Sequence, residues 1–119
     1  MTADAPLILI VDDDAGIRGM VELALTERGY RVATSDGSGT LEVDDVDLIL
    51  LDVRLRARSA LDLDFGDDAP PIVVMTAGDH GRRVAEQLHA VDRIAKPFDL
   101  VHLFDAVDRA LAGGARRAG

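Results

Sequence analysis

Short apolar runs alternate with polar stretches along the whole chain. The first run is Leu7 to Val11, and similar apolar runs cover 47–51, 72–75 and 93–95, with a more mixed run at 30–34. Each run is too short for a helix and has turn-forming residues beside it, so we predict five strands, several of them buried. Strands that alternate with polar stretches in this way predict βα units and a parallel sheet.

Three of the polar stretches predict helices. Residues 15–28 carry apolar side chains at helical spacing, with Asp14 placed to cap the first turn and Gly29 placed to end the helix. Residues 79–89 and 100–111 predict two further helices, whereas 113–119 reads as a flexible, frayed tail.

The other two connections are too short or too rich in turn residues for full helices. Residues 35–46 leave room for one or two helical turns, and 66–71 reads as loop. We therefore expect a remnant helix around 60–65, or none, with apolar side chains covering the sheet irregularly. These side chains are Leu55, Leu61, Leu63 and Phe65.

Polar side chains stand at the carboxyl ends of four predicted strands. Asp12 and Asp13 follow the first strand, and Asp52 follows the third. Thr76 follows the fourth strand, and Lys96 follows the fifth. Ligands bind beyond the carboxyl ends of the strands in open parallel sheets, so we expect one shared pocket. Carboxylates this close need a proton or a cation, and the set suits a hard divalent cation with a phosphoryl group.

Each of these residues also has a simpler explanation. Helix capping accounts for Asp14 and partly for Asp13, because carboxylates are favoured near a helix N-terminus. Asp52 alone could merely end a strand, and strand propensity could place Thr76. We favour the shared pocket because these positions follow successive strands. In addition, Lys96 is the only lysine in a chain with 13 Lys and Arg residues, and its compact charge suits a phosphoryl oxygen.

The composition excludes several classes of function. The chain has 119 residues, which fits a single domain over 1–119 with 1–5 as an N-terminal extension. It has no cysteine, and its formal net charge of −9 opposes binding to nucleic acid or to an anionic membrane. No apolar run is long enough for a signal sequence or a membrane span. We therefore expect a cytoplasmic protein with no DNA-binding module in this chain.

Four segments resemble the motifs of the receiver domains of two-component response regulators, which share the fold of the chemotaxis response regulator. These segments are Ile8 to Asp14, Asp47 to Asp52, Val73 to Ala77 and Lys96 to Phe98, in the order of that family. The resemblance implies a flavodoxin-like, doubly wound α/β fold with five parallel strands in the order 2-1-3-4-5. It also implies a signalling phosphoacceptor that is not an enzyme, beyond its own phosphorylation and dephosphorylation.

The resemblance implies a role for each acidic site residue. Asp52 would accept a phosphoryl group from a histidine kinase or a phosphotransfer protein, and signalling would follow by binding an unknown protein target. Asp12, Asp13 and Asp52 would bind Mg²⁺, together with the backbone carbonyl of Arg54.

Three further positions follow from the same resemblance. Thr76 and Lys96 would contact the phosphoryl oxygens, with Ala77 leaving space for that group. The Lys96–Pro97 peptide bond would be cis. The chain departs from the family pattern at Arg93, where receivers usually carry a Tyr or Phe switch. We expect a monomer in the unphosphorylated state, because the last helix lacks the charge pattern that dimerising receivers use.

Two alternatives stay open at this point. Arg93, Arg54 and the reduced connections favour a pseudo-receiver, which would be a protein-binding module not controlled by phosphorylation. The motif from Asp12 to Asp14 also resembles the nucleophile motif of haloacid dehalogenases, but Gly16 stands where that family needs Thr or Val.

Overall fold

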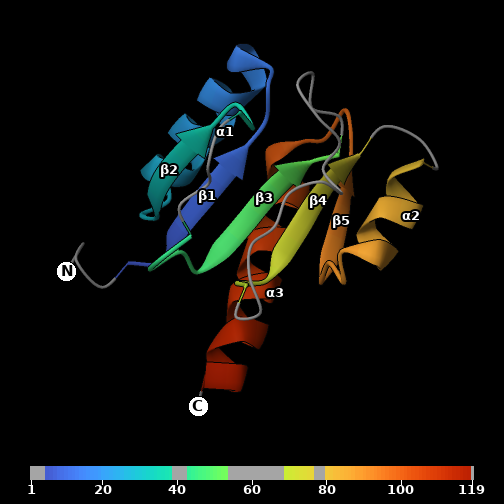
Figure 1. Ribbon diagram of the computed structural model, residues 1–119. Coiled ribbons are helices and arrows are strands. Elements are labelled where there is room, and N and C mark those ends of the chain that lie inside the picture. The colour runs from blue at the N-terminus through green and yellow to red at the C-terminus, as the bar shows by residue number, and fades with distance from the viewer. Residues whose placement is uncertain (1–4, 39–42, 54–68, 77–79, 119) are drawn as a thin grey trace.

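The computed structural model describes residues 5–38, 43–53, 69–76 and 80–118 (Figure 1). The remnant helix predicted around 60–65 and its four apolar side chains lie outside these residues, as do Arg54 and Ala77. In the connection between the second and third strands, the described residues 36–38 and 43–47 contain no helix.

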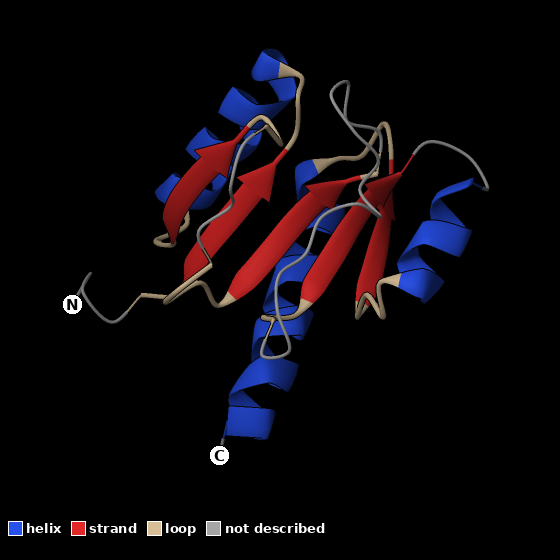
Figure 2. Ribbon diagram, in the orientation of Figure 1, coloured by secondary structure: helices blue, strands red, loops and turns tan. Residues whose placement is uncertain are grey.

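The described chain contains five strands and three helices. In order they are β1 (Leu7–Val11), α1 (Ala15–Glu27), β2 (Arg31–Ser35), β3 (Leu48–Asp52), β4 (Ile72–Thr76), α2 (His80–Gln87), β5 (Asp92–Ala95) and α3 (Leu100–Ala118). All the strand pairs are parallel, and the sheet has the order β2-β1-β3-β4-β5 (Figure 2). The predicted five-stranded α/β fold and its strand order are therefore confirmed.

The helices cover both faces of the sheet, which explains the continuous apolar runs. Alternate strand residues such as Ile8, Leu50 and Met75 pack with buried side chains of α1 and α3 on one face. Their neighbours, such as Leu9 and Ile49, pack on the other face together with α2. β3 and β4 are buried along their entire length, which accounts for the unbroken apolar runs Leu48–Leu51 and Ile72–Met75.

Helix α1 begins and ends where its sequence predicts. The Oδ1 atom of Asp14 accepts hydrogen bonds from the backbone N–H groups of Gly16 at 2.9 Å and Ile17 at 3.1 Å. Asp14 is therefore the N-cap of α1. At the other end, Gly29 has φ of 99°, a left-handed conformation that a residue without a Cβ adopts freely.

Helix α3 is longer than predicted. It continues through Gly113 to Ala118, so the predicted end at Leu111 is wrong. The residues beyond Leu111 are mainly alanine and arginine, two of the best helix formers, and no proline interrupts them. The helix therefore passes through two glycines that the sequence pattern treats as a stop.

A small cluster of side chains joins α3 to the turn between α1 and β2. Asp108 accepts hydrogen bonds from Arg28 Nη2 at 2.6 Å and from the hydroxyl of Tyr30. The Arg28 guanidinium also lies 4.4 Å from the ring centre of Phe104, within the range of a cation–π contact. Partial burial opposes ionisation of Asp108, but the hydrogen bonds from Tyr30 and Arg28 outweigh it and lower the pKa of this carboxyl.

None of the helices in the described ranges is both long enough and apolar enough to cross a membrane.

Candidate functional site

The strand register brings the carboxyl ends of four strands together at one end of the sheet. Val11 pairs with Leu51, so the residues that follow them, Asp12 and Asp52, lie side by side at the ends of β1 and β3. Asp52 pairs in turn with Met75 of β4. Thr76 pairs with Ala95, the residue before Lys96. The predicted pocket therefore lies at the carboxyl end of the sheet, as expected for an open parallel sheet.

Three carboxylates lie together at the carboxyl end of the sheet. Asp12, Asp13 and Asp52 each offer an oxygen, and these oxygens all lie within 4.8 Å of one another. Asp12 is fully buried and Asp52 is 6% exposed, whereas Asp13 is half-buried at the rim. Such a cluster of oxygen donors fits a hard divalent cation better than a soft metal.

Lys96 supplies a positive charge to the same cluster. Its Nζ atom lies 3.2 Å from Asp12 Oδ2 and 3.4 Å from Asp52 Oδ2. The backbone N–H of Lys96 also donates to the carbonyl oxygen of Thr76 at 2.6 Å, which fixes the lysine against the end of β4. The predicted cis peptide bond between Lys96 and Pro97 is present.

The backbone and side chain of Asp12 are held at several atoms. Its Oδ1 accepts the backbone N–H of Asp14 at 2.9 Å, and its own N–H donates to the carbonyl of Ser35 at 3.1 Å. The carbonyl oxygen of Asp12 accepts Nη1 of Arg18 at 2.7 Å. The Asp12 carboxylate is therefore fixed in direction before any ligand binds.

Sequence reasoning missed Arg18. This residue lies on α1 four positions after the N-cap Asp14, and residues four apart share one face of a helix. The first turn of α1 faces the pocket, because Asp14 directly follows the two site carboxylates. The spacing was therefore a usable signal, although it does not by itself identify the carbonyl that Arg18 binds.

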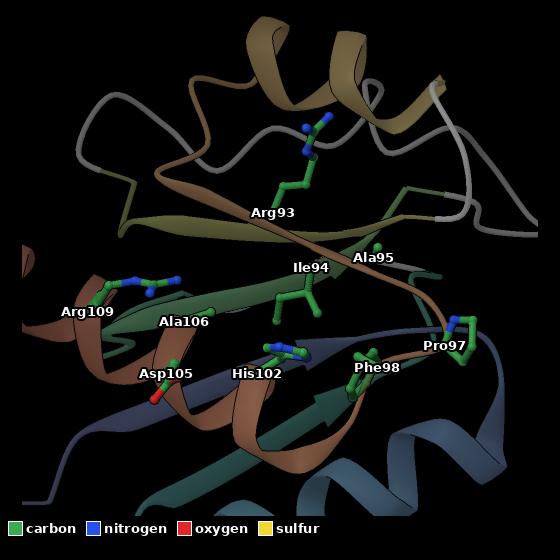
Figure 3. A pocket seen from close by; sticks show the side chains of 9 residues that line it. All are labelled: Arg93, Ile94, Ala95, Pro97, Phe98, His102, Asp105, Ala106 and Arg109. Carbon is green, nitrogen blue, oxygen red and sulfur yellow. The ribbon is translucent and has the colours of Figure 1, made fainter.

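The structure also describes two other predicted site residues, Thr76 and Arg93. Thr76 is buried at 3% exposure at the end of β4, beside the pocket. Arg93 is exposed on β5 and points away from α3, toward α2 (Figure 3). Arg54 and Ala77 lie outside the described residues. The structure thus brings Asp12, Asp13, Asp52 and Lys96 together.

Comparisons with known proteins give one consistent result. Residues 8–108 match the family described as the response regulator receiver domain. The chain is 34% identical to the DNA-binding transcriptional regulator NtrC of Rhizobium meliloti, over 92% of this chain and 25% of NtrC. It is 30% identical to sporulation initiation phosphotransferase F of Bacillus subtilis, over 87% of this chain and 92% of that protein.

A solved structure agrees with these similarities. The non-phosphorylated HemR receiver domain of Leptospira biflexa is 28% identical, with a TM-score of 0.75, over 89% of this chain and 94% of that one. The chain spans about a quarter of two of the transcriptional regulators that it matches, at 25% of NtrC and 26% of the regulator GlrR of Escherichia coli. The similarity to these regulators therefore concerns one part of their length.

Proposed function

This chain belongs to the response regulator receiver domain family, and from that membership we propose that Asp52 accepts a phosphoryl group from a histidine kinase or a phosphotransfer protein. Receiver domains are signalling modules and not true enzymes. The observation that carries the proposal is the convergence of Asp12, Asp13 and Lys96 on Asp52 at the carboxyl end of the sheet.

Asp52 is the carboxylate best placed to act as the nucleophile. It lies at the end of the central strand β3, beside the buried Asp12 on one side and Met75 of β4 on the other. An oxygen of Asp52 would attack phosphorus, forming a P–O bond as the P–N bond to the donor histidine breaks. The electron pair of that P–N bond leaves with the imidazole, and the product is an acyl phosphate.

Lys96 and Thr76 would orient the transferred group. The Lys96 ammonium lies 3.4 Å from Asp52 Oδ2, close enough to reach an oxygen of a phosphoryl group on that carboxylate. Thr76 ends the neighbouring strand, and its hydroxyl would donate to another oxygen. In-line transfer depends mainly on such positioning and charge, because the protein contributes little other covalent chemistry.

Asp12, Asp13 and Asp52 would hold Mg²⁺, with the backbone carbonyl of Arg54 as a further ligand. Three oxygen donors of this kind fit that ion, which prefers oxygen ligands and is usually held by one or two carboxylates with phosphate and water. When bound, Mg²⁺ would offset the negative charge that gathers on the carboxylates and the transferred group.

The experiment that tests the proposal is intact-mass measurement after incubation with acetyl phosphate. We expect one phosphoryl group to be added with Mg²⁺ and none with a chelator. Asp52→Asn should abolish the addition, whereas Asp44→Asn, an exposed carboxylate away from the pocket, should leave it unchanged. Phosphoryl transfer that persists in Asp52→Asn would contradict the assignment of the acceptor.

A protein-binding module not controlled by phosphorylation is the second candidate. Arg93 favours it, because an exposed charged residue occupies β5 where the resemblance implies an aromatic switch. The same measurement separates the two candidates. If the wild-type chain gains no mass and its amide NMR signals near Asp12 and Asp13 do not respond to Mg²⁺, the binding module is favoured.

A further inference from the structure

The hydrogen-bond ladder between β1 and β2 stops one step short at the carboxylate end of the sheet. It runs from the N–H of Arg31, which donates to the carbonyl of Pro6 at 3.0 Å. Its last bond joins the N–H of Asp12 to the carbonyl of Ser35 at 3.1 Å. The next donor in a parallel ladder of this register is the N–H of Gly37, which would meet the carbonyl of Asp12. That N–H donates instead to Ser35 Oγ at 3.0 Å.

Arg18 supplies the donor that the ladder leaves out. It lies near the start of α1, and its Nη1 atom is 2.7 Å from the carbonyl oxygen of Asp12. Asp12 is fully buried, so its carbonyl cannot turn to water for another donor. A charged donor also makes a stronger hydrogen bond than a neutral one. The arginine therefore replaces a backbone donor of β2 at this strand end.

This bond controls the peptide group between two residues of the carboxylate cluster. The N–H of Asp12 is held by Ser35, and its Oδ1 accepts the N–H of Asp14 at 2.9 Å. The carbonyl of Asp12 belongs to the peptide group that leads to Asp13, and Arg18 holds it. Rotation of this peptide group would redirect both Asp12 and Asp13. The directions of two of the three clustered carboxylates therefore depend on Arg18.

The charge of Arg18 acts against cation binding, whereas its hydrogen bond favours it. Hydrogen bonds from Ser38 lower the pKa of the Asp36 carboxyl, and the nearby positive charge of Arg18 lowers it further. The guanidinium thus lies between the ends of β1 and β2, beside the cluster. A positive charge there repels a bound cation. The two effects of Arg18 have opposite signs, so they can be told apart by experiment.

We propose that Arg18 is a positioning residue that makes the carboxylate cluster select Mg²⁺ over Ca²⁺. The inference rests on the proposed function, in which Asp12, Asp13 and Asp52 hold the ion. Mg²⁺ needs ligands in nearly ideal octahedral positions, whereas Ca²⁺ accepts more varied arrangements. Holding the carbonyl of Asp12 keeps the carboxylates where the smaller ion needs them. Release of that carbonyl therefore costs Mg²⁺ more affinity than Ca²⁺.

Two simpler explanations of Arg18 predict other results. If the arginine only stabilises the fold, its loss lowers the free energy of unfolding but leaves both ion affinities of the folded protein unchanged. If the arginine acts only through its charge, its loss strengthens the binding of both ions, because a repulsion is removed. Positioning alone predicts weaker binding of Mg²⁺ with a smaller effect on Ca²⁺.

The test is calorimetric titration of the full chain with MgCl₂ and, separately, with CaCl₂. Arg18→Met removes both the donor and the charge. We expect it to weaken Mg²⁺ binding about tenfold or more, as for other residues that hold a metal ligand without touching the metal. Binding of Ca²⁺ should weaken by about threefold or less. Arg18→Lys keeps a charged donor and should recover most of the Mg²⁺ affinity.

The matched control is Arg28→Met. It makes the same substitution at the other end of α1, where the arginine donates to Asp108, and should leave both ion affinities within about twofold of wild type. Arg18→Gln provides a second neutral variant, because its side chain is two bonds too short to reach the same carbonyl. It should show the same loss as Arg18→Met. Circular dichroism verifies that each variant is folded.

A second measurement needs no metal. The N–H of Asp14 donates to Asp12 Oδ1, so its hydrogen exchange, followed by NMR in the presence of a chelator, reports how firmly that carboxylate is held. We expect faster exchange in Arg18→Met than in Arg28→Met. Equal exchange of this amide in the two variants would contradict the positioning role.

The titrations also separate this inference from the proposed function. Unchanged or tighter Mg²⁺ binding in Arg18→Met, equal losses for Mg²⁺ and Ca²⁺, or an equal loss in Arg28→Met would overturn the inference. If wild type binds Mg²⁺ and is phosphorylated, such a result leaves the proposed function intact. If wild type binds neither ion, the inference is overturned together with the cation site of the proposed function.

Discussion

Replacing Lys96 with methionine tests how the cluster of carboxylates is stabilised. Methionine keeps most of the length and apolar volume of the lysine side chain but removes the ammonium. In the structure that ammonium lies 3.2 Å from Asp12 Oδ2 and 3.4 Å from Asp52 Oδ2. We expect Lys96→Met to lower the free energy of unfolding in the absence of divalent cations.

The distances set the size of the effect. At an effective dielectric constant of about 20, a pair of opposite unit charges at these separations attracts by about 5 kcal/mol. Two carboxylate oxygens no more than 4.8 Å apart repel by about 3.5 kcal/mol or more. The two attractions together are therefore of the same order as the summed repulsion among the three carboxylates. Lys96 keeps 20% of its side chain exposed, so we expect a net loss of about 3 kcal/mol, at the low end for breaking a buried pair.

Urea unfolding followed by far-ultraviolet circular dichroism measures this loss. Each variant is unfolded with a chelator and again with millimolar Mg²⁺. We expect the cation to restore roughly half of the deficit in Lys96→Met, since a ligand that binds only the folded state stabilises it. The cation would take over part of the compensating charge that the lysine supplied.

The control is Arg109→Met. Arg109 forms an ion pair with Asp92 at 2.8 Å, but 68% of the arginine side chain is exposed, so this variant should lose much less stability than Lys96→Met. Its cation site is intact, so Mg²⁺ should stabilise it by the same amount as wild type and by less than Lys96→Met. The reasoning is refuted if Lys96→Met loses no more stability than Arg109→Met in the chelator. It is also refuted if Mg²⁺ stabilises both variants equally.

Two further predictions concern other carboxylates. Asp12→Asn should weaken Mg²⁺ binding about tenfold or more, because it removes a buried charged ligand. Calorimetry measures this affinity, and the exposed control Asp44→Asn should bind Mg²⁺ as wild type does. Asp108→Asn should cost about 1 kcal/mol in urea unfolding at pH 7, since the hydrogen bonds from Arg28 and Tyr30 favour the ionised carboxylate and 42% of that side chain is exposed. The folded-state pKa of Asp108 is lowered, so its contribution to stability is present above the ordinary aspartate pKa and is lost as pH falls through the lowered value. The free energies of unfolding of wild type and Asp108→Asn should therefore converge in acid. A stability difference that stays constant down to the lowest pH would contradict this cause.

The strands and the pocket could be predicted because both depend on local patterns. A strand covered on two faces needs an unbroken apolar run, and runs such as Leu48 to Leu51 are buried throughout. A parallel sheet aligns the carboxyl ends of its strands, so the residues after each run had to meet. The capping of α1 by Asp14 also follows from a local rule.

The remaining features depend on contacts between distant parts of the chain. Asp108 lies 80 positions from Arg28, and nothing near either residue predicts their hydrogen bond. Arg18 is only six positions from Asp12, but which backbone carbonyl it contacts depends on how α1 leaves the sheet. The boundaries of two strands also differ from the predicted ones. β2 and β3 each begin one residue later than their patterns indicate, at Arg31 and Leu48.

The strand order also bears on how the protein is made on the ribosome. β1 and β3, which carry the acidic residues, leave the ribosome long before β5 and the lysine that follows it. Parallel neighbours cannot form as hairpins, so each pairing waits for a complete crossover. Until Lys96 emerges, the ammonium that lies beside Asp12 and Asp52 in the folded chain is missing. Synthesis therefore delivers the positive charge of Lys96 last, after both acidic strand ends that it lies between in the folded protein.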